Sequence, residues 1–342
     1  MTPPPPSADN IPDTAASDPG TEPPPPACVM TFNASDPSGA TGLAGDIATI
    51  AAMGAHALPI VTSIVMRDTA EVFDQHEIDA DAITEQARGI LEDVTVSGWK
   101  VGFLGTPDGV AAVAEILSDY TDVPVVSYLP NLSWLEEDQL QPYLEAFRDL
   151  ILPATEVLVG NHKALQDFLL PDWDSERPPS ARELAVAAGE HGTRYVLVTG
   201  VMLANKPGAR AGAGPAAEQF IDNILASPQG ALTGEKFERF DAGFVGAGET
   251  LSAALAALLA AGSELQAAVG EALSFLDQSL DAGFRPGMGN IVPDRFFWAL
   301  PTAEEGAEGE DGGPGDVGGG SGGPEGFGPD EQNQKGAPRR VH

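Results

Sequence analysis

Short apolar runs alternate with helix-like periodic segments along the middle of the chain. An apolar run bounded by glycine, proline or polar residues is typical of a buried strand. The strands predicted in this way are Val29–Phe32, Ala57–Ser63, Trp99–Leu104, Val123–Tyr128, Val157–Val159, Tyr195–Thr199 and Phe237–Phe240.

Most of the intervals between these runs place their apolar residues on one face of a helix. The predicted helices are Leu43–Met53, Asp81–Leu91, Thr106–Ser118, Leu135–Ile151, Ser180–His191, Thr250–Ala261 and Glu264–Asp281. This alternation predicts an α/β fold with a doubly wound, mostly parallel sheet flanked by helices. Ligands of such sheets bind beyond the carboxyl ends of the strands, so candidate chemistry is expected in the loops that follow strands.

The two ends of the chain lack this alternation. Residues 1–27 are rich in proline, and residues 301–342 are rich in glycine and acidic residues. Segments of these compositions cannot bury enough apolar surface to offset their ordering entropy. The sequence therefore predicts two disordered tails around a single domain over residues 28–300.

Composition narrows the classes of partner. The 342 residues carry 51 acids against 17 bases, a formal net charge of −34, which argues against nucleic acid and anionic membranes as partners. The single cysteine excludes an internal disulfide and fits a reducing cytoplasm. No apolar run is long enough to span a bilayer. The histidines show no zinc-ligand spacing, and no P-loop motif is present, so no metal site is assigned firmly.

A glycine turn precedes the alanine-rich helix near the end of the predicted domain. Gly246, Ala247 and Gly248 allow consecutive backbone N–H groups to point at one anion, and the helix N-terminus adds partial positive charge there. Glu249 stands in the first helical turn, where its carboxylate is suited to accept the proton of an attacking hydroxyl. The alternative is an ordinary helix start whose acidic residue complements the helix dipole.

Two further loops follow predicted strands. The segment Asn33–Gly42 is built from small residues and offers Asp36 to a ligand hydroxyl or amine; its alternative is a capped strand-to-helix turn. Asn161, after Val157–Val159, is suited to position phosphate or a hydrated magnesium ion, and its alternative is a turn cap.

Taken together, these motifs resemble a known family. The stretch Ala34–Gly39, followed by Gly42 and Asp46, resembles the N-terminal signature of the hydroxymethylpyrimidine/phosphomethylpyrimidine kinases of thiamine synthesis. Lys100–Leu104 resembles that family's Lys-Ile-Gly-Met-Leu strand. The segment Gly246–Ala257 resembles its glycine turn and the helix after it.

This resemblance implies a ribokinase-like fold that uses ATP and Mg²⁺ to phosphorylate a pyrimidine alcohol, with that alcohol and ATP as partners. It implies Glu249 as the catalytic position and Gly246, Ala247 and Gly248 as the anion hole. The other implied positions are Asp36, Gly39 and Ala44 for the acceptor and Asn161, Thr199 and Gly200 for the nucleotide or metal. The oligomeric state is open, with a homodimer as one alternative.

The chain departs from the family pattern at several of these positions. Glu249 replaces a cysteine and keeps the carboxylate of the catalytic aspartate found in related sugar kinases. Ala44 replaces a pyrimidine-reading glutamine, Ala164 a glutamate that helps to hold magnesium, and Thr199 a lysine. Two alternatives therefore stay open beside the thiamine-pathway kinase. One is a kinase for another alcohol, such as a pyridoxal-type vitamin or a sugar, and the other is a non-catalytic binding protein on the same fold.

Overall fold

The computed structural model describes residues 25–202, 220–238 and 242–299. Both predicted disordered tails lie outside the described residues, apart from residues 25–27. The end of the last predicted strand, Phe240, also lies outside them.

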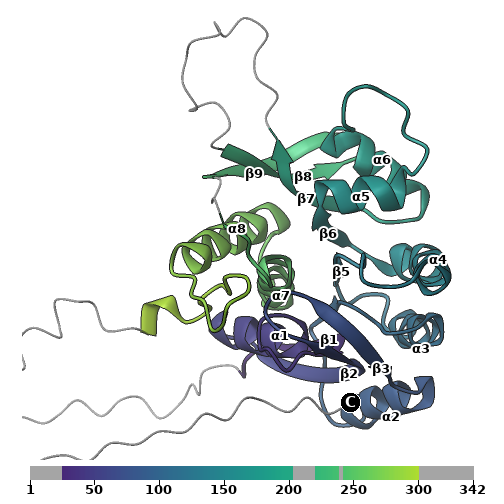
Figure 1. Ribbon diagram of the computed structural model, residues 1–342. Helices are drawn as coiled ribbons and strands as arrows, with labels where there is room; N and C mark the ends of the chain where they lie inside the picture. The colour runs from purple at the N-terminus through teal and green to yellow at the C-terminus, as the bar shows by residue number, and fades with distance from the viewer. Residues whose placement is uncertain (1–24, 203–219, 239–241, 300–342) are drawn as a thin grey trace, which may run out of the picture. The chain divides into compact units, whose positions relative to one another are not determined.

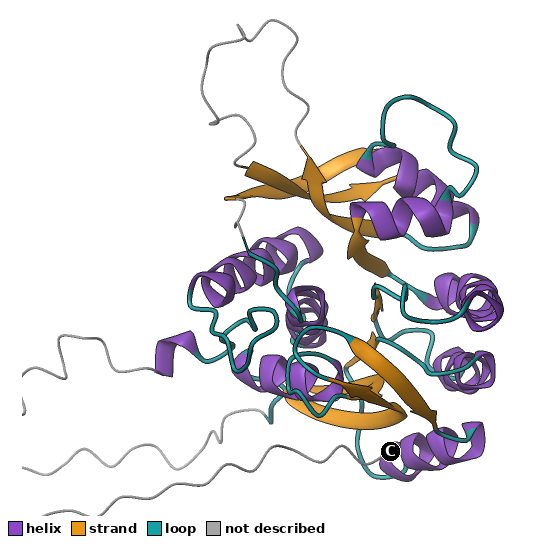
Figure 2. Cartoon of the chain, in the orientation of Figure 1, coloured by secondary structure: helices purple, strands orange, loops and turns teal. Residues whose placement is uncertain are grey.

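The described residues form one nine-stranded sheet in the order β3-β2-β1-β4-β5-β6-β7-β8-β9 (Figures 1 and 2). Its six central strands pair in parallel, which confirms the predicted doubly wound α/β fold. They are β1 (Cys28–Ser35), β2 (His56–Arg67), β4 (Gly98–Val101), β5 (Val125–Leu129), β6 (Val157–Asn161) and β7 (Tyr195–Met202).

Antiparallel strands extend the sheet at both edges. They are β3 (Val72–Glu77), which pairs with β2, and the hairpin of β8 (Phe220–Ser227) and β9 (Gly230–Glu238), which pairs with β7. The sequence did not predict β3 or β8, and it located only the end of β9. β3 carries exposed polar residues and β9 an interior glycine, Gly234, so the apolar pattern of these two edge strands is weak. In β8, which lies between β7 and β9, Asp222 and Asn223 interrupt the apolar run.

Helices cover both faces of the sheet (Figure 1). On one face lie α2 (Ala80–Leu91), α3 (Pro107–Ser118), α4 (Glu137–Ala146), α5 (His162–Leu169) and α6 (Ala181–Glu190). On the other face lie α1 (Gly42–Ala52), α7 (Ala247–Ala260) and α8 (Leu265–Asp281). The short helix α5 was not predicted. No helix among the described residues is long and apolar enough to cross a bilayer.

Two predicted elements end earlier or change form in the structure. The predicted strand Trp99–Leu104 stops at Val101, because the backbone then turns to let Phe103 N donate a 3.1 Å hydrogen bond to the Asn33 side chain. The predicted helix Leu135–Ile151 begins at Glu137 and continues past α4 as a π-helical turn over Phe147–Ile151.

Small side chains bring α7 close to the sheet. The alanines in the middle of this helix are at most 1% exposed, and a Cβ on Gly98 of β4 would lie 2.8 Å from the Ala260 side chain. Close packing of this kind needs alanine and glycine at the contact. It fixes the glycine turn at the start of α7 beside the carboxyl ends of the central strands.

Candidate active site

The glycine turn (Gly246–Glu249) opens α7. Gly246 is the N-cap residue, with a left-handed φ of +89°, and the first bond of the helix runs from Thr250 N to Gly246 O at 2.9 Å. The N–H groups of Ala247, Gly248 and Glu249 precede that bond and have no partner within the helix. The structure therefore presents a row of helix N-terminal donors, as an anion-binding turn requires.

Both glycines of the turn are required by close contacts. A Cβ on Gly246 would overlap the carbonyl oxygen of Ala40, and a Cβ on Gly248 would overlap the ring of Tyr128. Ala40 belongs to the Asp36 loop (residues 36–41) after β1, and Tyr128 lies near the end of β5. The turn is therefore held against two other strand ends.

We expect Gly248→Ala to lower kcat/KM about 100-fold, because the new methyl group must push the turn or Tyr128 aside and small displacements are costly in catalysis. Overpacking of this kind costs about 1–3 kcal/mol of stability. Steady-state kinetics and chemical denaturation test this prediction. Gly270→Ala in α8 is the matched control, since a Cβ there meets no heavy atom within 4 Å. Equal behaviour of the two variants would contradict the contact argument.

The Glu249 carboxylate is buried in a charged cluster beneath the turn. The residue is 4% exposed, forms an ion pair with Lys100 of β4, and accepts a 3.1 Å hydrogen bond from Asn33 Nδ2. Lys100 is fully buried and lies 2.9 Å from Asp46 Oδ1 of α1. Thr31 and Asn33 donate to Asp46 Oδ2 at 2.6 and 2.9 Å. One lysine therefore joins two buried carboxylates.

This environment changes the acid–base properties of the cluster. Burial raises the pKa of Glu249 above its usual value and the nearby Asp46 adds to this, while Lys100 acts in the opposite direction. Burial disfavours the charge on Lys100, but the carboxylates of Asp46 and Glu249 outweigh it and raise the pKa of the lysine. A carboxylate with a raised pKa is suited to general-base chemistry near neutral pH.

The Asp36 carboxylate organises its own loop. Oδ1 accepts hydrogen bonds from the Ser38 backbone N at 2.7 Å and the Ser38 hydroxyl at 2.6 Å, and Oδ2 accepts from Thr41 N at 2.8 Å. Arg67 Nη1 lies 3.7 Å from Oδ2. Both oxygens are engaged within the loop, which fixes the position of Asp36, and its role toward a ligand stays a prediction.

The other two residues predicted on the acceptor side lie around this loop. Gly39 is exposed at its tip with a φ of +71°, and Ala44 is half-buried in the first turn of α1. A cavity of about 520 Å³ opens beside the loop. It is lined by Pro37, Ser38, Arg67, Asp68, Thr69, Ala70, Gly287, Met288 and Gly289.

The residues predicted to position nucleotide or metal form a second group, with Asn161 at the end of β6 and Thr199 and Gly200 in the second half of β7. Asn161 is paired with Thr199 in the sheet, and a Cβ on Gly200 would lie 3.6 Å from Asn161 Nδ2. The Asn161 side chain caps α5, where Oδ1 accepts from Lys163 N at 2.8 Å. The structure brings the three residues together, and it shows Asn161 in the capping role that was its alternative.

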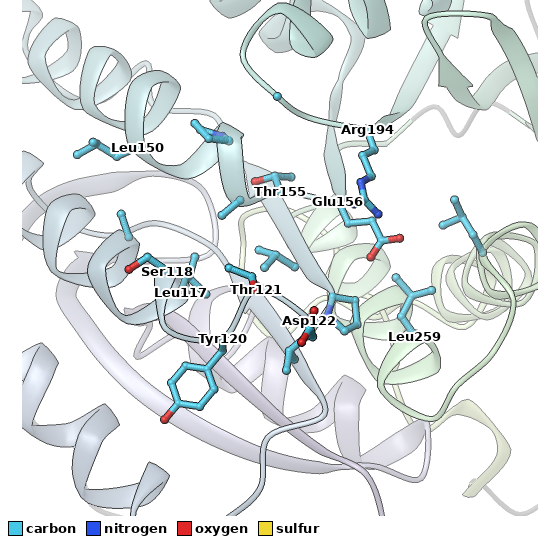
Figure 3. Close-up of a pocket in the computed structure, with 18 of the residues that line it drawn as sticks. Leu117, Ser118, Tyr120, Thr121, Asp122, Leu150, Thr155, Glu156, Arg194 and Leu259 are labelled. Atoms are coloured by element: carbon cyan, nitrogen blue, oxygen red, sulfur yellow. The ribbon is translucent and has the colours of Figure 1, made fainter.

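A second cavity, of about 730 Å³, is shown in Figure 3. It lies at the amino ends of the central strands, opposite the glycine turn. Its labelled residues include Glu156 and Arg194, which immediately precede β6 and β7. Ligands of parallel sheets bind beyond the carboxyl ends of the strands, so this cavity is not the candidate active site. No group of three or more metal-ligating His, Cys, Asp or Glu residues occurs in the described part of the chain.

Three residues of the site, Lys100, Asp46 and Arg295, were given no role on the basis of the sequence. Lys100 had a detectable signal, because a lysine between Trp99 and Val101 in an apolar strand has to find a buried partner, but the sequence did not identify Asp46 as that partner. Arg295 follows the last predicted helix and had no signal of this kind. In the structure it is 5% exposed and donates to Thr250 Oγ1 at 3.0 Å.

The fold is shared with solved structures of vitamin kinases. The ADP complex of Bacillus subtilis pyridoxal kinase superposes with a TM-score of 0.68 at 22% identity, covering 80% of this chain and 99% of that one. The phosphomethylpyrimidine kinase of Clostridium difficile gives a TM-score of 0.59 at 19% identity, covering 74% and 99%. The likeness in these two comparisons is one of fold. It shows that this chain has the α/β fold of these two kinases.

Sequence comparison identifies the family. The family described as phosphomethylpyrimidine kinase matches residues 36–294. The hydroxymethylpyrimidine/phosphomethylpyrimidine kinase of Streptomyces coelicolor is 29% identical over 281 residues, which span 82% of this chain and 98% of that protein. The Escherichia coli enzyme of the same name is 29% identical over 261 residues, spanning 73% and 90%. The chain belongs to the phosphomethylpyrimidine kinase family.

Proposed function

We propose that this protein transfers the γ-phosphoryl group of ATP to the hydroxymethyl group of hydroxymethylpyrimidine, of its monophosphate, or of both, in thiamine biosynthesis. In this proposal the kinase domain spans residues 28–300 and acts in the cytoplasm. Family membership and the geometry of the glycine turn support the proposal.

One observation supports Glu249 as the catalytic base of the proposed reaction. Lys100 and Asn33 both bind Oε2, and Oε1 has no hydrogen-bond partner among the described residues. One oxygen is thus anchored, while the other is left for a substrate hydroxyl. This arrangement orients a base without using up its acceptor capacity.

The proposed step balances simply. Glu249 Oε1 takes the hydroxyl proton as the substrate oxygen forms its bond to the γ-phosphorus, and the bond from that phosphorus to the bridging oxygen of ADP breaks. The N–H groups of Ala247 and Gly248 face the charge that spreads over the phosphoryl oxygens, and such preorganised donors stabilise the transition state. ADP leaves with the electron pair of the broken bond.

The carboxylates closest to the turn do not form a ready magnesium site. Asp46 and Glu249 are both buried and bound to Lys100, and Asn161 Oδ1 already caps α5. Mg²⁺ in phosphotransferases is held largely by substrate phosphates and water. The proposal therefore assigns no protein cage to the metal and takes no step through it.

A substrate panel tests the proposed activity. The purified full-length chain is incubated with ATP and Mg²⁺ and, separately, with hydroxymethylpyrimidine, its monophosphate, pyridoxal and ribose. We expect ADP release and a product heavier by one phosphoryl group with at least one of the two pyrimidines. Turnover of pyridoxal or ribose alone would move the acceptor to the alternative class, and no turnover with any alcohol would refute a kinase function.

The second candidate function, a kinase for a pyridoxal-type vitamin, is favoured by Ala44. Its methyl side chain offers no hydrogen bond to a pyrimidine ring from the first turn of α1. We expect Ala44→Gln to raise kcat/KM for the pyrimidine relative to pyridoxal by about 10-fold or more, the gain of about one good hydrogen bond. Competition between the two acceptors measures this ratio. An unchanged ratio would show that position 44 does not read the acceptor.

A further inference from the structure

Arg295 connects the two loops that frame the candidate active site. Its Nη2 donates to the carbonyl oxygen of Ala40 in the Asp36 loop at 2.7 Å and approaches that of Gly246 in the glycine turn at 3.5 Å. Its Nε donates to Thr250 Oγ1 at 3.0 Å, and that hydroxyl in turn donates to Gly246 O at 2.9 Å. A single guanidinium thus bonds to both loops.

The backbone fixes where this side chain lies. Ile291 exchanges hydrogen bonds with the strand-like lead into the turn, through Val245 N to Ile291 O and Ile291 N to Gly243 O, each 2.9 Å. Asp294 N then donates to Ser279 O of α8 at 2.9 Å. Arg295 is therefore presented by a segment that is tied to the turn on one side and to α8 on the other.

The contact also leaves a charge next to the turn. Burial lowers the pKa of Arg295, and the carboxylates of Asp46, Glu249 and Asp36 act in the opposite direction, so the guanidinium remains protonated. Removing this buried cation is costly, because the Ala40 carbonyl loses its hydrogen-bond donor without regaining water.

We propose that Arg295 is a positioning residue for phosphoryl transfer, which holds the Asp36 loop and the glycine turn at a fixed separation. The proposal rests on the kinase function proposed above. The residue lies just beyond the segment 36–294 that matches the family. It acts through the two loops, and the planar fork of its guanidinium, which donates in several directions at once, is what the role requires.

Loss of this connection would let the two loops move apart. Misplacement of a reacting group by about 1 Å can lower the rate about 100-fold. We therefore expect Arg295→Ala to lower kcat about 100-fold. Arg295→Lys is expected to recover only part of this loss, because an ammonium group cannot reproduce the fork. Millimolar guanidinium added to Arg295→Ala is expected to restore part of kcat, whereas methylammonium is not.

Arg88→Ala serves as the matched control. Arg88 lies in α2, pairs with Glu115 and Asp119, and has a side chain that is 45% exposed. This variant is expected to keep the wild-type kcat and to show no response to guanidinium. An arginine with a purely structural role would affect the melting temperature but not the kcat of the folded fraction.

A second measurement separates this proposal from the proposed function. Hydrogen exchange of the amides in residues 36–45 is compared between wild type and Arg295→Ala below the melting temperature of each. Faster exchange there, with no change in α2, supports the connection even if the wild type phosphorylates none of the alcohols. Unchanged exchange, or an unchanged kcat in an active enzyme, overturns it.

Discussion

Replacing Glu249 by glutamine is expected to lower kcat about 10²- to 10⁴-fold while leaving KM for ATP almost unchanged. General-base catalysis by a positioned side chain contributes a factor of this size. The amide keeps the shape of the side chain and can still accept from Lys100, but it cannot take a proton. Initial rates with the preferred acceptor and a thermal melt of the same sample measure the two effects separately.

Glu264→Gln is the matched control for this variant. Glu264 caps the start of α8, where its Oε2 accepts from Gln266 N at 3.0 Å, so it is also an acidic residue at a helix N-terminus. An acidic residue that only complements the helix dipole would give similar, small effects at both positions. A Glu249→Gln variant with wild-type kcat would remove Glu249 from the role of base.

The pH dependence of kcat is expected to follow the ionisation of Glu249. Its pKa is raised by burial, so the protonated, inactive form persists above the usual range of a glutamate. Activity should therefore fall as the pH drops through this raised pKa. The groups that set it are Asp46 from α1, Lys100 from β4 and Asn33 from β1. A kcat that stays constant from neutral pH down to pH about 4.5 would contradict the assignment.

The central part of the fold could be predicted because buried strands and helices have recognisable patterns of apolar residues. Runs such as Val157–Val159 are buried on both sides, as parallel strands between helical layers must be. The apolar pattern of the edge strands is weaker. In β3, exposed polar residues such as Asp74 and Glu77 alternate with few apolar ones, so tertiary pairing with β2 decides the conformation.

The candidate site could be predicted only as far as its chemistry is local. The glycine turn is encoded within a few residues, because its conformation and its donors come from one stretch of backbone. Asp36 was also located, but its hydrogen bonds to Ser38 and Thr41, which organise the loop, were not predicted. The Lys100 cluster and the Arg295 contacts join residues far apart in sequence. A lysine in an apolar strand indicates that a buried partner exists, but the sequence does not identify which residue that partner is.

Removing the positive charge of Lys100 is expected to destabilise the fold more than Gly248→Ala or Glu249→Gln does. Lys100→Met leaves the carboxylates of Asp46 and Glu249 buried together without a cation. Breaking a buried ion pair from one side costs about 3–5 kcal/mol of unfolding free energy. Urea denaturation at pH 7 measures it. If the variant does not fold, the double variant with Asp46→Asn is expected to recover part of the loss.

Lys163→Met provides the matched control. It separates the effect of burying an ion pair on unfolding free energy from the effect of losing a lysine charge. Lys163 pairs with Asp167 at 2.8 Å, close to the 2.9 Å between Lys100 and Asp46, but the Lys163 and Asp167 side chains are 81% and 59% exposed. Solvent screening limits such a pair to about 0.5 kcal/mol or less. Similar losses in the two variants would mean that the Lys100 cluster does not behave as a buried ion pair.

The loss of stability in the Lys100→Met variant is expected to depend on pH. Without the cation, the pKa of at least one buried carboxyl should rise in the folded state above its unfolded value. A carboxyl with a raised folded pKa stabilises the fold below the unfolded pKa, and this contribution is lost as the pH rises through the folded pKa. The variant should therefore be closer to wild type at pH 5 than at pH 8. The same lysine would then support both the stability of the fold and the ionised state of the proposed base.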